Sequence, residues 1–180
     1  MELKSALEQL GLLQKKLYAY QTASSSLYLD SVTVAPKDTS EGRGVALGIL
    51  AGESQKLMTA PETGELLAFL ADQKENLSFV EQRQVEELKR SYDRLSRIPA
   101  DEYMDYAMLT NEASDVWHRA KESSDFTLFA PVLEKLVAYN RKFAGYYDSS
   151  KKPYDALLDE YERGADMAFL DTFFETVRER

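Results

Sequence analysis

Two segments decide the fold of this chain: DVWHRAKESSDFTLFAPVLEKLV at residues 115–137 and KKPYDALLDEYERG at residues 151–164. The first contains the end of one amphipathic helix and the start of another, because Asp125 has the side chain to cap a new helical turn. The second predicts a short helix after Pro153 that ends at Gly164, which suits the left-handed backbone position of a helix end. The rest of the chain predicts helices that pack against these segments or connect them.

The helix that leads into residues 115–137 has apolar and aromatic side chains three and four positions apart. This inner face consists of Tyr103, Tyr106, Thr110, Ala113, Trp117 and Ala120. Because a tryptophan usually buries most of its surface, we expect Trp117 to anchor the core. Beyond Asp125 the periodicity continues through Leu133, Leu136, Asn140, Phe143 and Tyr147.

The start of the chain predicts a long first helix followed by an extended segment. The apolar seam of this helix has a spacing close to that of a coiled coil. It consists of Leu3, Leu7, Leu10, Leu13 or Gln14, Leu17 and Tyr20. The helix should reach at least Tyr28, after which the β-branched residues 32–34 before Pro36 favour extended backbone. We therefore expect a loop or a short strand-like turn in this region.

A further helix is predicted at residues 43–58. It should turn four apolar side chains inward, those of Ala46, Ile49, Leu50 and Leu57. Gly48 and Gly52 lower its intrinsic helix propensity. Close packing against another helix would explain both glycines.

Two pairs of residues have the spacing of a capping box, in which a hydroxyl and a carboxylate satisfy the first amides of a helix. Thr59 with Glu62 predicts the start of a short helix at residues 61–73. Ser78 with Glu81 predicts the start of a long helix, which Pro99 ends while opening the next one. The apolar face of the long helix consists of Val85, Leu88, Tyr92 and Leu95.

The last predicted helix, at residues 165–180, has Leu170, Phe173, Phe174 and Val177 on one face. The chain stops while this pattern continues, whereas a natural domain usually finishes with a cap or a polar tail. We therefore expect residues 1–180 to form a single all-α domain, a multi-helix bundle of about eight helices. We expect this domain to be part of a longer protein.

Composition excludes several classes of function. The 180 residues include 22 basic and 31 acidic side chains, and the resulting net charge of −9 disfavours binding to nucleic acids and anionic membranes. No window offers the roughly 18 apolar residues of a membrane span, and the start MELKSALEQLG lacks the order of a signal peptide. The absence of cysteine fits a reducing compartment. We expect a cytoplasmic protein without nucleic-acid or membrane partners.

Several segments together carry a resemblance to a known family. They are LYLDSVTVAPKDTSEGR (27–43), TAPETGELL (59–67), LKRSYDRLSRIPAD (88–101), WHRAKESSDFTLFAPVLEKLV (117–137), PYDALLDEYERG (153–164) and LDTFFETVR (170–178). In this order they resemble the thermostable zinc metallocarboxypeptidases of the carboxypeptidase Taq family, which remove C-terminal residues from peptides. The resemblance covers most of this chain but only the N-terminal portion of such an enzyme.

The resemblance implies the N-terminal helical part of a zincin-type fold, whose helices form one side of a deep groove. The family's loop is matched at Asp30, Pro36 and Arg43, whereas this sequence departs from it at Leu29, Ala35 and residues 38–40. The segment from Asp30 to Arg43 is then either part of a substrate-groove wall or a loop that packs on its own helix. We favour the second interpretation, because loops carry function disproportionately but not usually.

Histidine content bears on the metal site. Zinc peptidases of this type use the H-E-x-x-H arrangement, two imidazoles one helical turn apart. This chain has only His118, so we assign no catalytic, metal or cofactor residue in it and expect zinc only in the full-length family enzyme. Asp115 and His118 have the spacing of half a di-metal site, but without a second histidine we expect His118 to be a surface or hydrogen-bonded residue beside Trp117.

A cluster of acidic residues occupies the short helix after Pro153. These residues are Asp155, Asp159, Glu160 and Glu162. They admit a role in acid–base chemistry or calcium binding, but they lack the spacing of a calcium-binding loop. Acidic residues near a helix start are usually caps and solvated charges, and we favour that interpretation.

The eleven tyrosines are numerous enough for a peptide-binding surface, because the ring supplies apolar contact and the hydroxyl a hydrogen bond. Tyr92, Tyr103 and Tyr106 fall on inner faces of predicted helices, where we expect core positions. No substrate-binding residue is assigned.

Three hypotheses remain from the sequence, of which the third is an unrelated helical bundle whose motif matches are accidental. In the first, the chain is the N-terminal part of a metallocarboxypeptidase, inactive alone, that meets a peptide substrate only together with the missing C-terminal part. In the second, it is a non-catalytic helical module that binds peptides or proteins. Either of these two hypotheses allows a homo-oligomer through the uncovered apolar face around Phe173 and Phe174.

Overall fold

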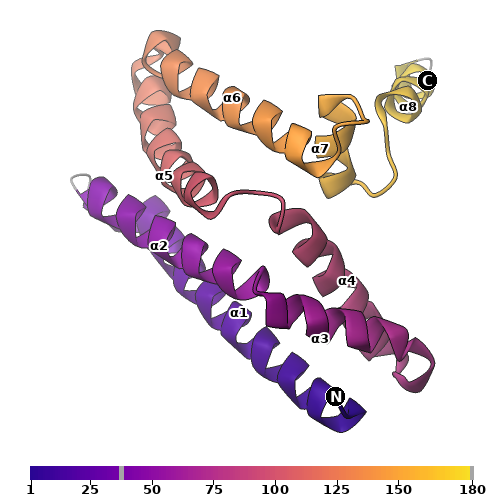
Figure 1. Cartoon of the computed structure of the whole chain (residues 1–180). Helices are drawn as coiled ribbons and strands as arrows, with labels where there is room; N and C mark the ends of the chain where they lie inside the picture. Colours follow the sequence, from indigo (N-terminus) through magenta and orange to yellow (C-terminus); the bar gives the residue numbers. More distant parts are fainter. Residues whose placement is uncertain (37–38, 179–180) are drawn as a thin grey trace. The chain divides into compact units, whose positions relative to one another are not determined.

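The computed structural model of the protein describes residues 1–36 and 39–178. Over these residues the chain forms eight α-helices and no β-strand, which confirms the prediction of an all-α fold with about eight helices. The chain divides into two compact units, residues 1–132 and residues 133–180 (Figure 1). That both belong to a single domain stays a prediction.

The first unit contains five α-helices. They are α1 (Leu3–Thr33), α2 (Ser40–Met58), α3 (Pro61–Asp72), α4 (Phe79–Leu95) and α5 (Ala100–Ser123). Helix α2 packs against both α1 and α5, while α3 packs against α4 and against α1. Figure 1 shows α1 and α2 running side by side, with the α3–α4 hairpin at the end where the N-terminus lies.

The apolar core of this unit forms where α1, α3 and α4 meet. It consists of Ala6, Leu10, Leu66, Leu67, Leu70, Leu77 and Val85. The predicted seam of the first helix is confirmed, because Leu10 and Leu13 are buried and Leu3 packs against the core. Burial of a leucine such as Leu67 contributes about 1.5–3 kcal/mol, so this cluster is a major source of stability.

Helix α1 reaches Thr33, so the extended backbone expected at Val32 and Thr33 is wrong, whereas Val34 lies in a turn after the helix. The hydroxyls of Ser31 and Thr33 donate to the carbonyls of Tyr28 and Leu29 one turn earlier, so this last turn is helical although β-branched residues occupy it. The helix ends when the Val34 amide donates to the Asp30 carbonyl. The predicted departure at Asp38 lies outside the described residues.

Helices α2 and α5 are in close contact through glycine. A Cβ atom on Gly48 would lie 2.6 Å from Met108 Cγ, and one on Gly52 would lie 3.7 Å from Met104 Sδ. This confirms that close packing explains both glycines. Because ascending positions on α2 face descending positions on α5, the two helices are antiparallel. The predicted inward position of Ile49 is wrong: Ile49 is 55% exposed, since it directly follows the glycine face.

Trp117 does not anchor the core as predicted. It is 42% exposed, and the buried face of α5 is instead Leu109, Ala113, Val116 and Ala120. The Trp117 ring meets His118 edge-on with centroids 4.8 Å apart, and Lys121 Nζ lies 4.8 Å from its centroid. The buried positions beside Trp117 on the helix are taken by the smaller side chains of Ala113, Val116 and Ala120.

One predicted capping box is present and the other is wrong. Ser78 caps α4: its amide and hydroxyl donate to Glu81 Oε2 at 2.7 and 2.6 Å, and its hydroxyl accepts from the Glu81 amide. The hydrogen bonds from the Ser78 hydroxyl and amide lower the pKa of Glu81. Before α3 the N-cap is Ala60, because the Thr59 hydroxyl donates instead to the Gln55 carbonyl.

Near the end of the first unit, Asp125 caps a short turn as predicted, because its Oδ1 accepts from the Thr127 amide at 2.9 Å. The remaining helices are α6 (Ala130–Tyr147), α7 (Pro153–Tyr161) and α8 (Met167–Arg178). Gly164 has a φ of 76°, which confirms the predicted left-handed position after α7. Helix α8 starts two residues later than predicted, after Asp166, and the predicted end at Arg180 lies outside the described residues.

Helix α8 exposes most of its apolar side chains. These are Met167, Phe169, Phe173, Phe174 and Val177. The rings of Phe173 and Phe174 meet edge-on with centroids 5.4 Å apart. The predicted apolar face is therefore present and uncovered among the described residues. None of the helices described is both long and apolar enough to cross a membrane.

Candidate functional site

A groove of about 480 Å³ runs between α1, α2 and α5. Its size falls in the range of pockets that hold small ligands. From α1 it is lined by Tyr20, Gln21, Ser24, Ser25, Tyr28 and Ser31, from α2 by Leu47, Leu50, Ala51 and Ser54, and from α5 by Tyr103, Ala107, Thr110, Asn111, Ser114 and Asp115. The groove therefore combines apolar side chains with many hydroxyl and amide groups.

Helical periodicity explains why these residues share a groove. Each helix contributes positions about three and four apart, which lie on one face. The α1 face extends from Tyr20 to Ser31 and the α5 face from Tyr103 to Asp115, which at 1.5 Å per residue gives a trough about 17 Å long. Helix α2 packs on both other helices and forms the floor with Leu47, Leu50 and Ala51.

One end of the groove is fixed by Arg43. Its side chain is only 8% exposed and its terminal nitrogen lies 3.5 Å from an Asp115 carboxylate oxygen. Arg43 Nε also donates to Asn111 Oδ1 at 3.3 Å, while Asn111 Nδ2 donates to the Ser40 carbonyl at 3.2 Å. This network ties the start of α2 to α5.

This network corrects part of the loop prediction. The segment from Asp30 to Arg43 does not pack only on its own helix, because Arg43 is fixed to α5. Asp30 belongs to α1 rather than to a loop. Arg43 is therefore a structural tie at the groove's end, and Asp115 is the groove residue that it holds.

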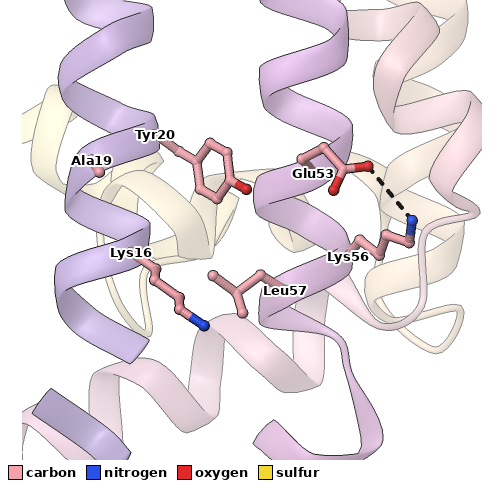
Figure 2. Close-up of a pocket in the computed structure, with 6 residues that line it drawn as sticks. All are labelled: Lys16, Ala19, Tyr20, Glu53, Lys56 and Leu57. Carbon is pink, nitrogen blue, oxygen red and sulfur yellow. Dashed lines mark ion pairs between the residues drawn. The ribbon is translucent and has the colours of Figure 1, made fainter. Parts of the chain in front are cut away.

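A second hollow of similar size lies next to the groove, between α1 and α2 (Figure 2). It is lined by Lys16, Ala19, Tyr20, Glu53, Lys56 and Leu57. Figure 2 shows the Tyr20 ring projecting from α1 towards α2, and Tyr20 belongs to both hollows. Lys56 Nζ lies 3.5 Å from Glu53 Oε1, so two of its three charges are paired.

The structure does not bring the half di-metal pair together as a site. Asp115 faces Arg43, whereas His118 lies against Trp117, as expected for a surface histidine. Within residues 1–36 and 39–178, no group of three or more His, Cys, Asp or Glu side chains is arranged to hold a metal ion.

The acidic residues of α7 act as caps, as favoured from the sequence. Asp155 Oδ1 accepts from the Met167 amide at 2.9 Å, and Asp159 Oδ1 accepts from the Gly164 amide at 3.0 Å. These carboxylates satisfy backbone amides between α7 and α8. Glu160 and Glu162 are exposed.

Sequence reasoning missed the groove. Its signal is the alternation of tyrosine and serine at four-residue spacing in the first helix, as in Tyr20, Ser24 and Tyr28. This face starts at Tyr20, the last residue of the predicted apolar seam, and the rest of the groove's lining comes from α2 and α5. Tyr103, expected in the core, lines the groove, whereas Tyr92 packs against the core as expected.

Fold and groove together define an all-helical scaffold that presents an elongated trough. The sequence model of the carboxypeptidase Taq (M32) metallopeptidases matches residues 9–180. The chain therefore belongs to this family.

Individual relatives show which part of the family's fold is present. Carboxypeptidase 1 of Bacillus subtilis is 36% identical over 167 residues, which cover 93% of this chain and 33% of the relative. Thermostable carboxypeptidase 1 of Pyrococcus furiosus is 31% identical over 166 residues, again 33% of its length. The chain thus spans about a third of the length of these relatives, corresponding to their N-terminal portion.

Solved structures agree with this assignment. The crystal structure of BsuCP superposes with a TM-score of 0.91 at 35% identity, covering 97% of this chain and 35% of that structure. Trypanosoma cruzi metallocarboxypeptidase 1 superposes with a TM-score of 0.77 at 29% identity and similar coverage. The helical scaffold is therefore the family's own.

Proposed function

We propose that this chain is the N-terminal helical part of a cytoplasmic, zinc-dependent metallocarboxypeptidase that releases C-terminal residues from peptides, and that it hydrolyses no peptide alone. The observation that carries the proposal is the family match over residues 9–180 combined with coverage of only 33% of each curated relative. The absence of cysteine supports a reducing compartment.

The residues of the described chain do not fit a catalytic zinc site. Such a site takes three protein ligands and keeps a fourth position open. The single histidine of the sequence, His118, is exposed beside Trp117, and no three metal-ligating side chains converge within residues 1–36 and 39–178. We therefore propose that the metal ligands belong to the two-thirds of the family's chain that these 180 residues do not cover.

The test compares two proteins. One is the 180-residue chain, and the other is this chain continued by the remaining two-thirds of Bacillus subtilis carboxypeptidase 1. We expect only the second to contain stoichiometric zinc by elemental analysis and to release C-terminal residues in a chelator-sensitive manner. Stoichiometric zinc and peptide hydrolysis by the 180-residue chain alone would overturn the proposal.

A second candidate function is a non-catalytic module that binds peptides or proteins. It is favoured by the uncovered aromatic face of α8, where Phe169, Phe173 and Phe174 are exposed, because such patches often mark interaction sites. The encoding gene discriminates between the two candidates. A reading frame that continues into H-E-x-x-H supports the peptidase, and a stop codon after Arg180 supports the module.

A further inference from the structure

We propose that the groove between α1, α2 and α5 binds about five residues of an extended peptide with uncharged side chains. The choice of a peptide rests on the proposed function. The length, polarity and charge of the peptide are inferred from the groove itself.

The shape of the groove fits an extended chain. Its walls run from Tyr20 to Ser31 and from Tyr103 to Asp115, a length of about 17 Å at 1.5 Å per helical residue. An extended peptide advances about 3.3 Å per residue, so roughly five residues occupy this length. A single amino acid or a dipeptide would leave most of the trough empty.

The hydroxyl groups of the groove fit a peptide backbone. Ser24, Ser25, Ser54 and Ser114 line it, and their side-chain hydroxyls make no hydrogen bond to any residue within the described ranges. Two other serines of α1 do: Ser26, outside the lining, and Ser31, within it, donate to carbonyls of the preceding turn. Because a hydroxyl both donates and accepts, these side chains match the alternating N–H and C=O groups of an extended peptide.

The floor of the groove is apolar. Leu47, Leu50 and Ala51 of α2 lie between the tyrosines of α1 and the α5 wall. Every second side chain of an extended peptide points to the same face. Apolar side chains of the peptide therefore have a surface to pack against, while its backbone meets hydroxyl groups.

The charges of the groove favour an uncharged peptide. Asp115 is the only charged residue among those that line it, and Arg43 already pairs with its carboxylate at 3.5 Å. A basic side chain therefore finds no unpaired carboxylate in the lining. An acidic side chain finds no basic residue in the lining and meets a protein of net charge −9, so glutamate-rich peptides should bind least well.

The test is fluorescence anisotropy of the 180-residue chain with a labelled peptide of roughly eight alanine, serine, leucine and phenylalanine residues. We expect saturable binding. The affinity of unlabelled competitors of the same composition should increase with their length up to about five residues and little beyond that length. Competitors in which two side chains are glutamate should bind about tenfold more weakly.

Two substitutions in the groove have matched controls on the same helices. Leu50→Lys places a charge on the floor, and its control is Ile49→Lys on the exposed side of α2. Ser24→Trp fills the trough, and its control is Ser26→Trp outside the lining. We expect each groove variant to weaken binding about tenfold or more and each control to change it less than about twofold, at equal helical content by circular dichroism.

Three outcomes would overturn the proposal. The first is that none of these peptides shows saturable binding. The second is that groove and control variants change the peptide affinity equally. The third is that the chain self-associates and Leu50→Lys abolishes this association, which would make a second copy of the chain the occupant of the groove. None of these outcomes bears on zinc-dependent release by the extended protein. Failure of the groove and failure of the proposed function are therefore distinguishable.

Discussion

Replacing Gly48 by alanine tests whether the contact of α2 with α5 holds the first unit together. A Cβ atom at this position would lie 2.6 Å from Met108 Cγ, 3.1 Å from Met108 Sδ and 3.4 Å from Met104 Cγ. Carbon atoms do not approach to 2.6 Å, so Met108 must move or the two helices must separate. Gly11 of α1 is the matched control, because an added Cβ there meets nothing within 4 Å.

The expected change in the free energy of unfolding follows from two opposed effects. Alanine is favoured over glycine in a helix interior by about 1 kcal/mol, and this gain is common to both positions. Overpacking costs typically about 1–3 kcal/mol, and only Gly48→Ala incurs it. We therefore expect Gly11→Ala to raise the free energy of unfolding by about 1 kcal/mol, and Gly48→Ala to fall about 1–3 kcal/mol below that variant.

The assay is urea denaturation followed by circular dichroism. The slope of the unfolding free energy against urea concentration should be the same in all variants, which checks two-state behaviour. Met108→Ala provides a second comparison, because it removes the atoms that the new Cβ would meet. In that background Gly48→Ala should approach the effect of Gly11→Ala. Equal stabilisation by Gly48→Ala and Gly11→Ala in the natural background would refute the close contact.

Three other predictions concern polar and exposed features. Asp115→Asn removes the carboxylate that pairs with Arg43, whose side chain is 8% exposed. This substitution should lower the free energy of unfolding by about 1–3 kcal/mol in urea denaturation. An unchanged free energy of unfolding would contradict the structural tie. Hydrogen bonds from Ser78 lower the pKa of Glu81 below its ordinary value of 4.5, so this capping contribution is present above that pH and lost as pH falls through the lowered pKa. Ser78→Ala should therefore reduce stability at neutral pH but progressively less in acid, and a pH-independent difference would contradict the assignment. We predict that the chain self-associates through the exposed face of α8, so Phe173→Glu should decrease self-association in analytical ultracentrifugation without changing helical content, and an unchanged association state would contradict this prediction.

Much of the fold was predictable because periodicity and caps are local signals. The buried seam through Leu10 and Leu13 and the capping box of Ser78 with Glu81 are both contained within a few turns of one helix. The positive φ of Gly164 likewise follows from the residue type. Such features need no knowledge of which helix packs against which.

The errors arose where tertiary contacts override local preference. Ile49 and Trp117 were expected inside because they are large and apolar, but the α2 side of its contact with α5 is made of Gly44, Gly48 and Gly52, which face Asn111, Met108 and Met104. Ile49 directly follows one of these glycines and points away from the contact, and the buried positions beside Trp117 are Ala113, Val116 and Ala120. None of these glycines indicates from sequence alone which helix it meets.

The groove was beyond sequence reasoning for a related reason. Its lining comes from three helices, and the tie between Arg43 and Asp115 joins residues 72 positions apart. The serines of α1 gave no sign of function by themselves, since serine on a helix surface is common. Their role becomes visible only when Ser54 and Ser114 are placed opposite them.

The most direct test of the account measures release of the C-terminal residue from a peptide, with and without a chelator. The proteins compared are the 180-residue chain alone and the same chain continued by the remaining two-thirds of Bacillus subtilis carboxypeptidase 1. We predict no release by the chain alone and chelator-sensitive release by the continued protein. Chelator-sensitive release by the 180-residue chain alone would contradict this prediction.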